Sequence, residues 1–259
     1  MSANLTRIRA AFHVHSNWSY DGKWTLSQIA ADFSERGYDA VMLSEHDRGF
    51  DERRRQEHRE ACRQASTSKI LLAPGIEYSD ASNTMHFLIW DDVPFIGSDL
   101  PADEILTAAH NAGAVVVFAH PSRRAAWKSF NPDWTRKLAG IELWNRKTDG
   151  WAPSMDAPLL LRGADALPFV GMDFHERRQF FPLATVLDVE APVTESSILA
   201  AIRAGRCRSE AFGLSLDCFL HGIGARTLSL AEFCRRKAAP LYRKLSKPAA
   251  SRKQTVTNP

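Results

Sequence analysis

The histidine and carboxylate side chains of this sequence gather in short motifs whose composition is typical of metal sites. In chain order the motifs are HVHS with His13 and His15, SYDG with Asp21, SEHD with His46 and Asp47, GIEY with Glu77, MHF with His86, AHPS with His120, and DFH with Asp173 and His175. Six of the nine histidines belong to this set. Imidazole nitrogens and carboxylate oxygens together suit Zn²⁺, Mn²⁺ or Fe²⁺. The motifs therefore predict a centre of two or three divalent ions.

A centre of this kind predicts phosphate-ester chemistry. Two neighbouring divalent ions stabilise both the attacking and the leaving oxygens of a phosphoryl transfer. A metal-bound hydroxide serves as the nucleophile near neutral pH, so that no separate serine or cysteine nucleophile is needed. The four cysteines are scattered and form no CxxC pair, which indicates free thiols and no thiolate zinc site. Among the carboxylates, Glu77 is suited to bridge two ions.

Short apolar runs that alternate with helix-like stretches must position these side chains. The expected strands are Ala10–Val14, Ala40–Leu43, Ile70–Leu72 running on to Ile76, His86–Trp90, Ala114–Ala119, Gly140–Trp144, Phe169–Met172 and Ala184–Val189. The expected helices are Thr25–Arg36, Asp51–Ala65, Pro101–Asn111 and Ser196–Ala204. This alternation predicts an α/β fold, with a barrel favoured, and barrels carry functional residues at the C-terminal ends of their strands. The spacing of two in HVH puts both histidines on one face of an extended segment.

The charge of the chain is divided unevenly. The net charge is +3, but nine basic residues and one acidic residue follow from Arg226 onward, so the first 225 residues are mildly acidic. We expect a catalytic barrel over residues 1–225 and a basic C-terminal extension over 226–259, disordered from Lys247. The stretch Ser229–Lys247 is basic with interleaved apolar residues, a pattern that also suits nucleic acid or an anionic membrane. Because Pro240 should break a helix there, a loosely docked tail is the preferred interpretation.

Neither a membrane span nor a secretion signal is evident. No segment approaches the roughly 18–20 apolar residues that a transmembrane helix needs, and the N-terminal residues contain no apolar run typical of a signal peptide. A cytoplasmic location is therefore the expectation.

Taken together and in order, the motifs resemble those of the PHP (polymerase and histidinol phosphatase) superfamily. The matching segments are HVHSNWSYDG, SEHD, GIEYSD with MHF, FAHPS and GMDFH, and they span roughly Phe12 to Val189. The resemblance implies a distorted (β/α)7-type barrel with a trinuclear metal centre at the C-terminal ends of the strands. It assigns His13, His15, Glu77 and Asp173 to the first ion, Glu77, His86 and His120 to the second, and Asp21, His46 and His175 to the third. The position of Asp21 is often histidine in the family, and an ordinary Asp-Gly turn is the alternative interpretation of Asp21.

Other polar residues near the motifs are candidates for catalysis or for substrate binding. Glu77, Asp173, His175 and Asp47 are the expected catalytic residues, and Asp47 either orients a ligand or water, or caps a helix. The candidates for contact with substrate phosphate are Arg48, Arg123, Arg124, Arg177, Arg178 and Asn145.

The expected activity is hydrolysis of a small phosphomonoester. A nuclease or phosphodiesterase acting on nucleotides or short nucleic acids is the alternative enzyme, because the same metal centre suits both reactions. A non-catalytic metal-bound module is the alternative from another class, but all nine ligand positions of the family are occupied here. A carbon–nitrogen hydrolase with a metal barrel is the remaining alternative, and the order of the motifs argues against it.

Overall fold

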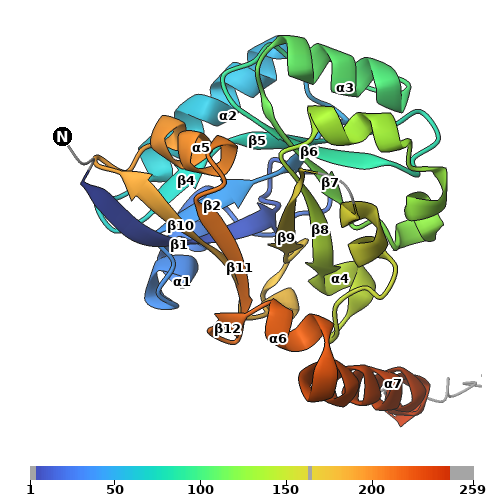
Figure 1. Ribbon diagram of the computed structural model, residues 1–259. Coiled ribbons are helices and arrows are strands. Elements are labelled where there is room, and N and C mark those ends of the chain that lie inside the picture. Colours follow the sequence, from blue (N-terminus) through green and yellow to red (C-terminus); the bar gives the residue numbers. More distant parts are fainter. Residues whose placement is uncertain (1–3, 163–164, 246–259) are drawn as a thin grey trace, which may run out of the picture.

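Figure 1 shows the computed structural model, which describes residues 4–162 and 165–245 and has a mixed α/β fold. Its strands form two six-stranded sheets. The first sheet, in spatial order, consists of β12 (Leu214–Ser215), β11 (Cys207–Ala211), β10 (Leu183–Glu190), β1 (Leu5–Val14), β2 (Ala40–Leu43) and β4 (Leu71–Ala73). The second consists of β3 (Glu45–His46), β5 (Gly75–Ser79), β6 (His86–Trp90), β7 (Val115–Ala119), β8 (Gly140–Asn145) and β9 (Leu167–Gly171).

Helices connect the strands and cover the sheets. The α-helices are α1 (Leu26–Glu35), α2 (Glu52–Ala65), α3 (Ala102–Asn111), α4 (Arg146–Asp149), α5 (Glu195–Arg203), α6 (Asp217–Leu220) and α7 (Gly222–Leu245). Short 3-10 helices are η1 (Arg123–Ser129), η2 (Pro132–Lys137), η3 (Ala157–Leu161) and η4 (Arg177–Gln179). Side-chain caps define several starts: Thr25 and Thr194 form capping boxes at α1 and α5, and Asp51 accepts from Arg54 N–H at α2.

The two sheets face each other across a shared apolar core. The Phe12 ring of β1 lies 5.4 Å from the Trp90 ring of β6 and 5.1 Å from the Phe169 ring of β9, between ring centroids. Val117 of β7 and Leu187 of β10 belong to the same buried cluster. This packing fixes the strands relative to one another, and so it fixes the side chains at their ends.

The predicted α/β class is confirmed, and closure of the two sheets into a barrel stays a prediction. The four predicted helices correspond to α1, α2, α3 and α5. The strand predicted from Ile70 to Ile76 is wrong: β4 ends at Ala73 and β5 begins at Gly75, in different sheets. Pro74 separates them, because proline has no N–H to donate to a ladder. The second sheet is not wholly parallel, since β6 runs antiparallel to both β5 and β7.

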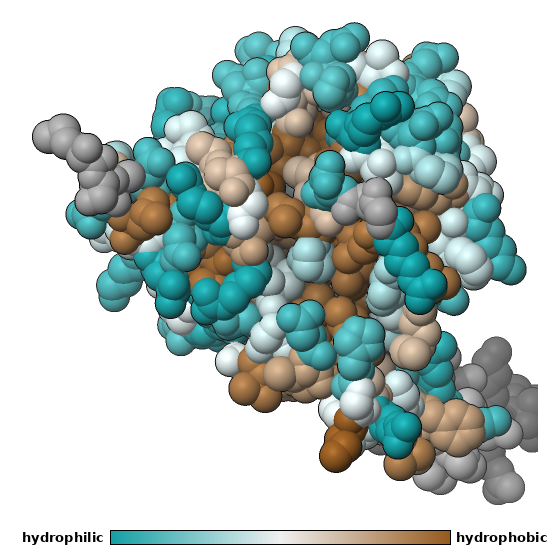
Figure 2. Space-filling model, viewed as in Figure 1, coloured by the Kyte–Doolittle hydropathy of each residue, from teal (hydrophilic) through white to brown (hydrophobic). Residues whose placement is uncertain are grey.

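The C-terminal helix corrects a second prediction. Helix α7 runs from Gly222 to Leu245 without a break at Pro240, so the proline costs the helix one backbone hydrogen bond and does not end it. The boundary expected after residue 225 falls inside this helix, and the segment from Lys247 lies outside the described residues. In Figure 1 α7 extends away from the sheets, and Figure 2 shows brown, hydrophobic areas at its end of the molecule, where Ile223 and Leu230 are exposed. Among the described residues, no helix combines the length and apolar character needed to cross a bilayer.

Candidate metal centre

The motif side chains meet at one edge of the paired sheets. His13 lies near the end of β1, Glu77 lies in β5, His120 directly follows β7, and Asp173 lies two residues after β9. His86 is the first residue of the antiparallel β6, opposite both Ser79 and Ala119, so its N-terminal position places it at the same edge. The structure thus brings nine predicted side chains together, and we refer to them as the ligand cluster: His13, His15, Asp21, His46, Glu77, His86, His120, Asp173 and His175.

The backbone bends sharply where three of these residues leave their strands. His13, His120 and Asp173 have φ angles of 62°, 28° and 49°, a left-handed conformation that is uncommon for residues other than glycine. The pairing of β1 with β2 shifts register between Phe12 and Val14, so the HVH segment is not the regular extended segment that its spacing suggested. Backbone strain of this kind persists only where the surrounding structure holds it, and it is concentrated at functional sites.

The HVH and DFH motifs lie side by side. His15 N–H donates to the Phe174 carbonyl at 2.8 Å, and Phe174 N–H donates to the His13 carbonyl at 3.2 Å. Both motifs therefore present their side chains to the same space, although 160 residues of sequence separate His13 from Asp173. Tertiary pairing, and not the spacing within either motif, creates this part of the ligand cluster.

The Glu77 carboxylate occupies the centre of the ligand cluster. One oxygen, Oε1, lies 2.7 Å from His86 Nδ1, 2.9 Å from His120 Nε2 and 3.5 Å from His13 Nε2. The other, Oε2, lies 3.0 Å from His46 Nδ1 and 3.5 Å from His15 Nε2. Glu77 is 1% exposed, and its two oxygens face two different groups of imidazoles. A carboxylate in this position is placed to bridge two metal ions.

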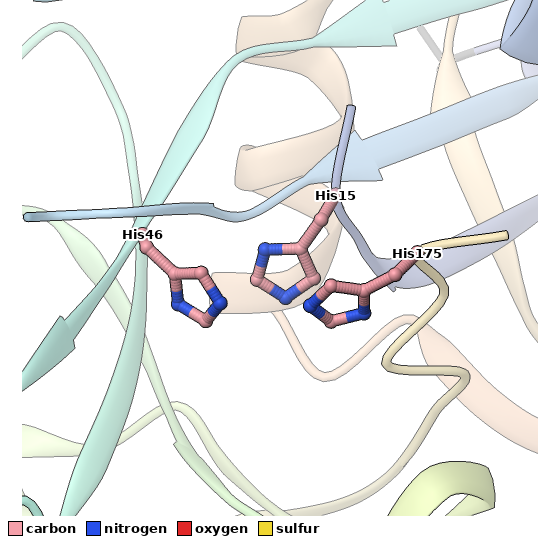
Figure 3. Close-up of side chains that lie close together, drawn as sticks. All are labelled: His15, His46 and His175. Atoms are coloured by element: carbon pink, nitrogen blue, oxygen red, sulfur yellow. The ribbon is translucent and has the colours of Figure 1, made fainter. Parts of the chain in front are cut away.

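Two aspartates complete the cluster on the other side. Asp173 Oδ1 lies 3.7 Å from His15 Nε2 and 3.4 Å from His175 Nδ1. Asp21 Oδ1 lies 3.3 Å from His46 Nε2, and its Oδ2 lies 3.2 Å from His175 Nε2. Figure 3 shows the His15, His46 and His175 rings pointing toward one another from the end of β1, from β3 and from the segment after β9. The side chain of Asp21 therefore lies against two imidazoles of the cluster.

The donor set fits divalent cations. Nitrogen and oxygen ligands about 2.0–2.2 Å from one ion lie about 3–3.5 Å from each other, which is the range of most distances within the cluster. Three groups have ligand atoms that all lie within 4.8 Å of one another: His15 with His46 and His175, His13 with Glu77 and His120, and His13 with His15 and Asp173. Several buried atoms have no hydrogen-bond partner among the described residues, namely Nε2 of His13, His15 and His46, Nδ1 of His120, Oδ1 of Asp21 and Oε2 of Glu77. Buried polar atoms without partners are costly unless something else binds them.

The electrostatics of the cluster also favour cations. Burial opposes ionisation of Glu77, yet the surrounding imidazoles hold its pKa well below the ordinary value. Burial likewise opposes ionisation of Asp173, and the neighbouring His13 and Lys147 lower its pKa to about 2. Both carboxylates are therefore ionised near neutral pH, although they are buried. Negative charge held on buried side chains attracts a cation strongly.

A carboxylate outside the cluster, Glu142, fixes the orientation of ligand residues, and the sequence analysis missed it. Glu142 of β8 lies 2.8 Å from His13 Nδ1 through Oε1, and its Oε2 accepts His120 N–H at 2.8 Å. A carboxylate on Nδ1 holds that nitrogen protonated and leaves Nε2 free as a ligand. A Cβ at Gly171 would lie 1.8 Å from Glu142 Oε1, so glycine is required there. The signal in the sequence was an acidic residue within the apolar run GIELW, because a buried charge needs partners.

Glu45 performs a similar role on the side of His15. It is fully buried and accepts Ser16 Oγ–H at 2.6 Å and Ser19 Oγ–H at 2.5 Å. The Ser19 hydroxyl in turn lies 3.3 Å from His15 Nδ1 and accepts His46 N–H at 3.0 Å. Burial alone would raise the pKa of Glu45, but hydrogen bonds from His58 and the two serines lower it. Two ligand histidines are thus positioned through one buried carboxylate.

The ligand cluster opens onto a cavity of about 470 Å³. Arg48, Arg123 and Lys147 line this cavity, and we call these three residues the cationic rim. Asp47 also lines it, accepts Ser79 N–H at 3.4 Å, and has a pKa that burial raises to about 6. Six of the nine cluster residues line this cavity: Asp21, His46, Glu77, His86, His120 and Asp173.

The remaining candidates for substrate contact lie elsewhere. Asn145 is fully buried and donates to Glu142 Oε2 at 3.0 Å, behind the ligand cluster. Arg124 donates to the Asn83 carbonyl at 2.8 Å, and neither it nor the exposed Arg177 and Arg178 of η4 is among the residues that line the cavity. Arg123, in contrast, has Nη1 3.0 Å from His86 Nε2. Lys147 was not identified from the sequence, because nothing in NRKT marks a residue that reaches a site formed by other strands.

The solved structures that resemble this chain include the following three. A two-domain protein from Bacteroides vulgatus that contains a predicted PHP-like metal-dependent phosphoesterase is 20% identical, with a TM-score of 0.60, over 82% of this chain and 67% of that one. PsfC from Pseudomonas syringae is 12% identical, with a TM-score of 0.60, over 90% and 99% of the two chains. The lesion-specific endonuclease PfuEndoQ from Pyrococcus furiosus is 16% identical, with a TM-score of 0.54, over 77% and 56%.

No protein-family model and no curated protein sequence matches the chain. The structural likenesses nevertheless agree with the motifs. The chain has the fold of PHP-like proteins, as the order of its motifs predicted.

Proposed function

We propose that this chain is a metal-dependent phosphatase that hydrolyses phosphomonoesters of small molecules. Two or three divalent ions, Zn²⁺, Mn²⁺ or Fe²⁺, would bind at the C-terminal strand ends of a distorted barrel. The observation that carries the proposal is the ligand cluster itself, in which six imidazoles and three carboxylates converge, several with buried atoms that lack partners among the described residues. The fold is also that of proteins described as a metal-dependent phosphoesterase and an endonuclease.

The distances suggest how the cluster divides among the ions. His13, His15, Glu77 and Asp173 would hold one ion, and Glu77, His86 and His120 a second. The third site would consist of Asp21, His46 and His175, in which the Asp21 oxygens lie 3.3 Å from His46 Nε2 and 3.2 Å from His175 Nε2. Divalent ions bound there would polarise the phosphoryl oxygens and activate a water molecule.

The residues around the cluster would position the reactants. Glu142 and Glu45 hold the ligand imidazoles in orientation, as described above. Asp47 lines the cavity and is engaged by Ser79 N–H, so we assign it the role of hydrogen-bonding the attacking water or the leaving oxygen. Arg48 and Arg123 of the cationic rim face the same cavity, where a guanidinium matches the oxygens of phosphate.

A nuclease or phosphodiesterase is the second candidate. The likeness to PfuEndoQ and the basic residues of α7, among them Arg226 and Lys237, favour it. The cavity lining argues for a smaller substrate, because Asp80 and Asp99 also line it and would repel a long polyanion. A small monoester therefore remains the leading proposal.

Elemental analysis of the purified protein, combined with turnover assays in added Mn²⁺ or Zn²⁺, tests the proposal. We expect two or three transition-metal ions per chain and faster hydrolysis of p-nitrophenyl phosphate than of bis(p-nitrophenyl) phosphate, with both activities lost after chelation. Cleavage of the diester alone would favour the second candidate. Full metal content without turnover of either ester class would favour a non-catalytic metal-bound module. Absence of bound metal after reconstitution would refute the proposal.

A further inference from the structure

Lys147 places a flexible cation directly against the ligand cluster. It lies on α4, the short helix that follows β8, and its Nζ is 3.2 Å from Asp173 Oδ1 and 3.3 Å from His175 Nε2. Its side chain is 40% exposed and lines the cavity. The ammonium group therefore contacts two cluster residues and remains accessible to a ligand that enters the cavity.

The backbone that carries Lys147 is held in place from three directions. The Asn145 side chain caps α4 by accepting Thr148 N–H at 3.0 Å, and the buried Asp149 carboxylate accepts Asn145 N–H at 2.7 Å. Helix α7 supports the same segment, because Glu232 accepts Trp151 N–H at 2.9 Å. The backbone at Lys147 is thus fixed while its long side chain is flexible, so the ammonium group can adjust to a ligand without a movement of the backbone.

The positions of Lys147 and Arg123 bracket the cluster. Lys147 contacts Asp173 and His175, whereas Arg123 Nη1 lies 3.0 Å from His86 Nε2. An anion seated over the cluster would meet a side-chain cation at each of these ends. The arrangement suits a ligand with several charged oxygens in different directions.

We infer that Lys147 binds a terminal oxygen of the substrate phosphate and that it determines the preference for monoesters over diesters. This inference rests on the proposed function. A terminal phosphate presents three free oxygens with a charge near −2, whereas a diester presents two with a charge of −1. The ammonium group has three N–H donors, and its attraction to the anion grows with the charge of the anion. Lys147 therefore contributes more to binding a monoester than to binding a diester.

Binding of inorganic phosphate and of dimethyl phosphate to the metal-loaded protein tests this inference without requiring turnover. Calorimetry at mildly alkaline pH would compare the wild type with Lys147→Met, which keeps the chain length and removes the charge. We expect Lys147→Met to weaken phosphate binding by about 10- to 100-fold and dimethyl phosphate binding by less than about threefold. Lys147→Arg should retain most of the phosphate affinity. Lys128→Met is the matched control, because Lys128 is exposed on η1 and is not among the residues that line the cavity.

Each contrary outcome overturns the inference. Unchanged phosphate affinity in Lys147→Met, equal losses for both anions, or a wild type that binds no phosphate would each do so. Loss of bound metal in Lys147→Met, measured by elemental analysis of the same samples, would show that Lys147 instead supports the ligand cluster. A wild type that binds phosphate through Lys147 but cleaves no ester would refute the proposed function alone.

Discussion

The ligand cluster and the cationic rim lie at the same cavity but differ in how deeply their side chains are buried. All cluster residues except Asp21 lie on strands or within four residues of a strand end, and all except Asp21 are buried. The rim residues lie outside the strands: Lys147 is on α4, Arg123 begins η1, and Arg48 follows β3. Arg48 and Lys147 are exposed.

This difference separates the two tasks of the site. Buried side chains held by Glu142 and Glu45 cannot rearrange without leaving charges unpaired, so we expect the cluster to be rigid and to determine the chemistry. Long side chains outside the strands can follow a ligand, so we expect the rim to determine which phosphate is accepted. Substitutions in the cluster should therefore abolish metal binding, whereas substitutions at the rim should change affinity for the substrate.

The largest effect should come from Glu77→Gln. The substitution removes the charge of the carboxylate whose oxygens lie 2.7–3.5 Å from five imidazoles, so we expect loss of at least one ion and a fall in kcat/KM of about a thousandfold or more. Elemental analysis and steady-state kinetics measure both. Glu190→Gln, at an exposed position of β10, is the matched control. Normal metal content in Glu77→Gln would remove the basis for distinguishing the cluster from the rim.

A smaller effect is expected from Glu142→Gln, which acts on the cluster from behind. The carboxylate of Glu142 now contacts His13 Nδ1 with one oxygen and accepts His120 N–H with the other. The amide of glutamine has the same size but can accept at only one of these two positions, because its NH₂ group is a donor. Loss of such a partner costs about 10- to 100-fold in metal affinity. Titration of the apoprotein with Zn²⁺, with circular dichroism as a check on folding, measures it. Metal affinity equal to that of the wild type would mean that Glu142 only supports the fold.

The cluster was predictable from sequence, and the reason lies in the strands. A ligand residue at the end of an apolar run, as in the segments before His120 and Asp173, needs only the rule that parallel strands end at one edge. The detailed geometry needed tertiary structure. The bend at His13 and the antiparallel direction of β6, which brings His86 to the edge from its N-terminal end, are not encoded in any local pattern.

The rim was much less predictable. Arginines that directly follow the motifs were all equal candidates, yet only Arg48 and Arg123 line the cavity, while Arg177 and Arg178 lie on η4. Lys147 follows no ligand motif and reaches the site only because β8 lies beside β9 in the sheet. Helix α7 was predicted to break at Pro240 and to dock loosely, but Glu232 anchors it to the segment beyond Lys147. Such contacts depend on side chains that meet from distant parts of the chain.

The smallest expected effect therefore concerns Glu232, which supports the rim from outside the cavity. Burial alone would raise the pKa of Glu232, but hydrogen bonds from Arg235, Arg236 and Trp151 N–H lower it to about 2. A carboxyl group with a depressed pKa stabilises the fold above its unfolded pKa of about 4.3, and this contribution is lost as the pH falls toward 2. Glu232→Gln should consequently lower Tm by about 2–6 °C at neutral pH, and the difference from the wild type should shrink between about pH 4.5 and pH 2.

The same variant distinguishes the rim from the cluster. Because Glu232 holds Trp151 N–H and not a cluster residue, Glu232→Gln should weaken phosphate binding by only about two- to fivefold and leave metal content unchanged. Thermal unfolding across pH, phosphate calorimetry and elemental analysis on one preparation measure all three. Loss of metal would contradict the separation, since it would mean that α7 supports the ligand cluster as well as the cationic rim. Unchanged phosphate affinity with a lower Tm would show instead that α4 holds Lys147 in position without help from α7.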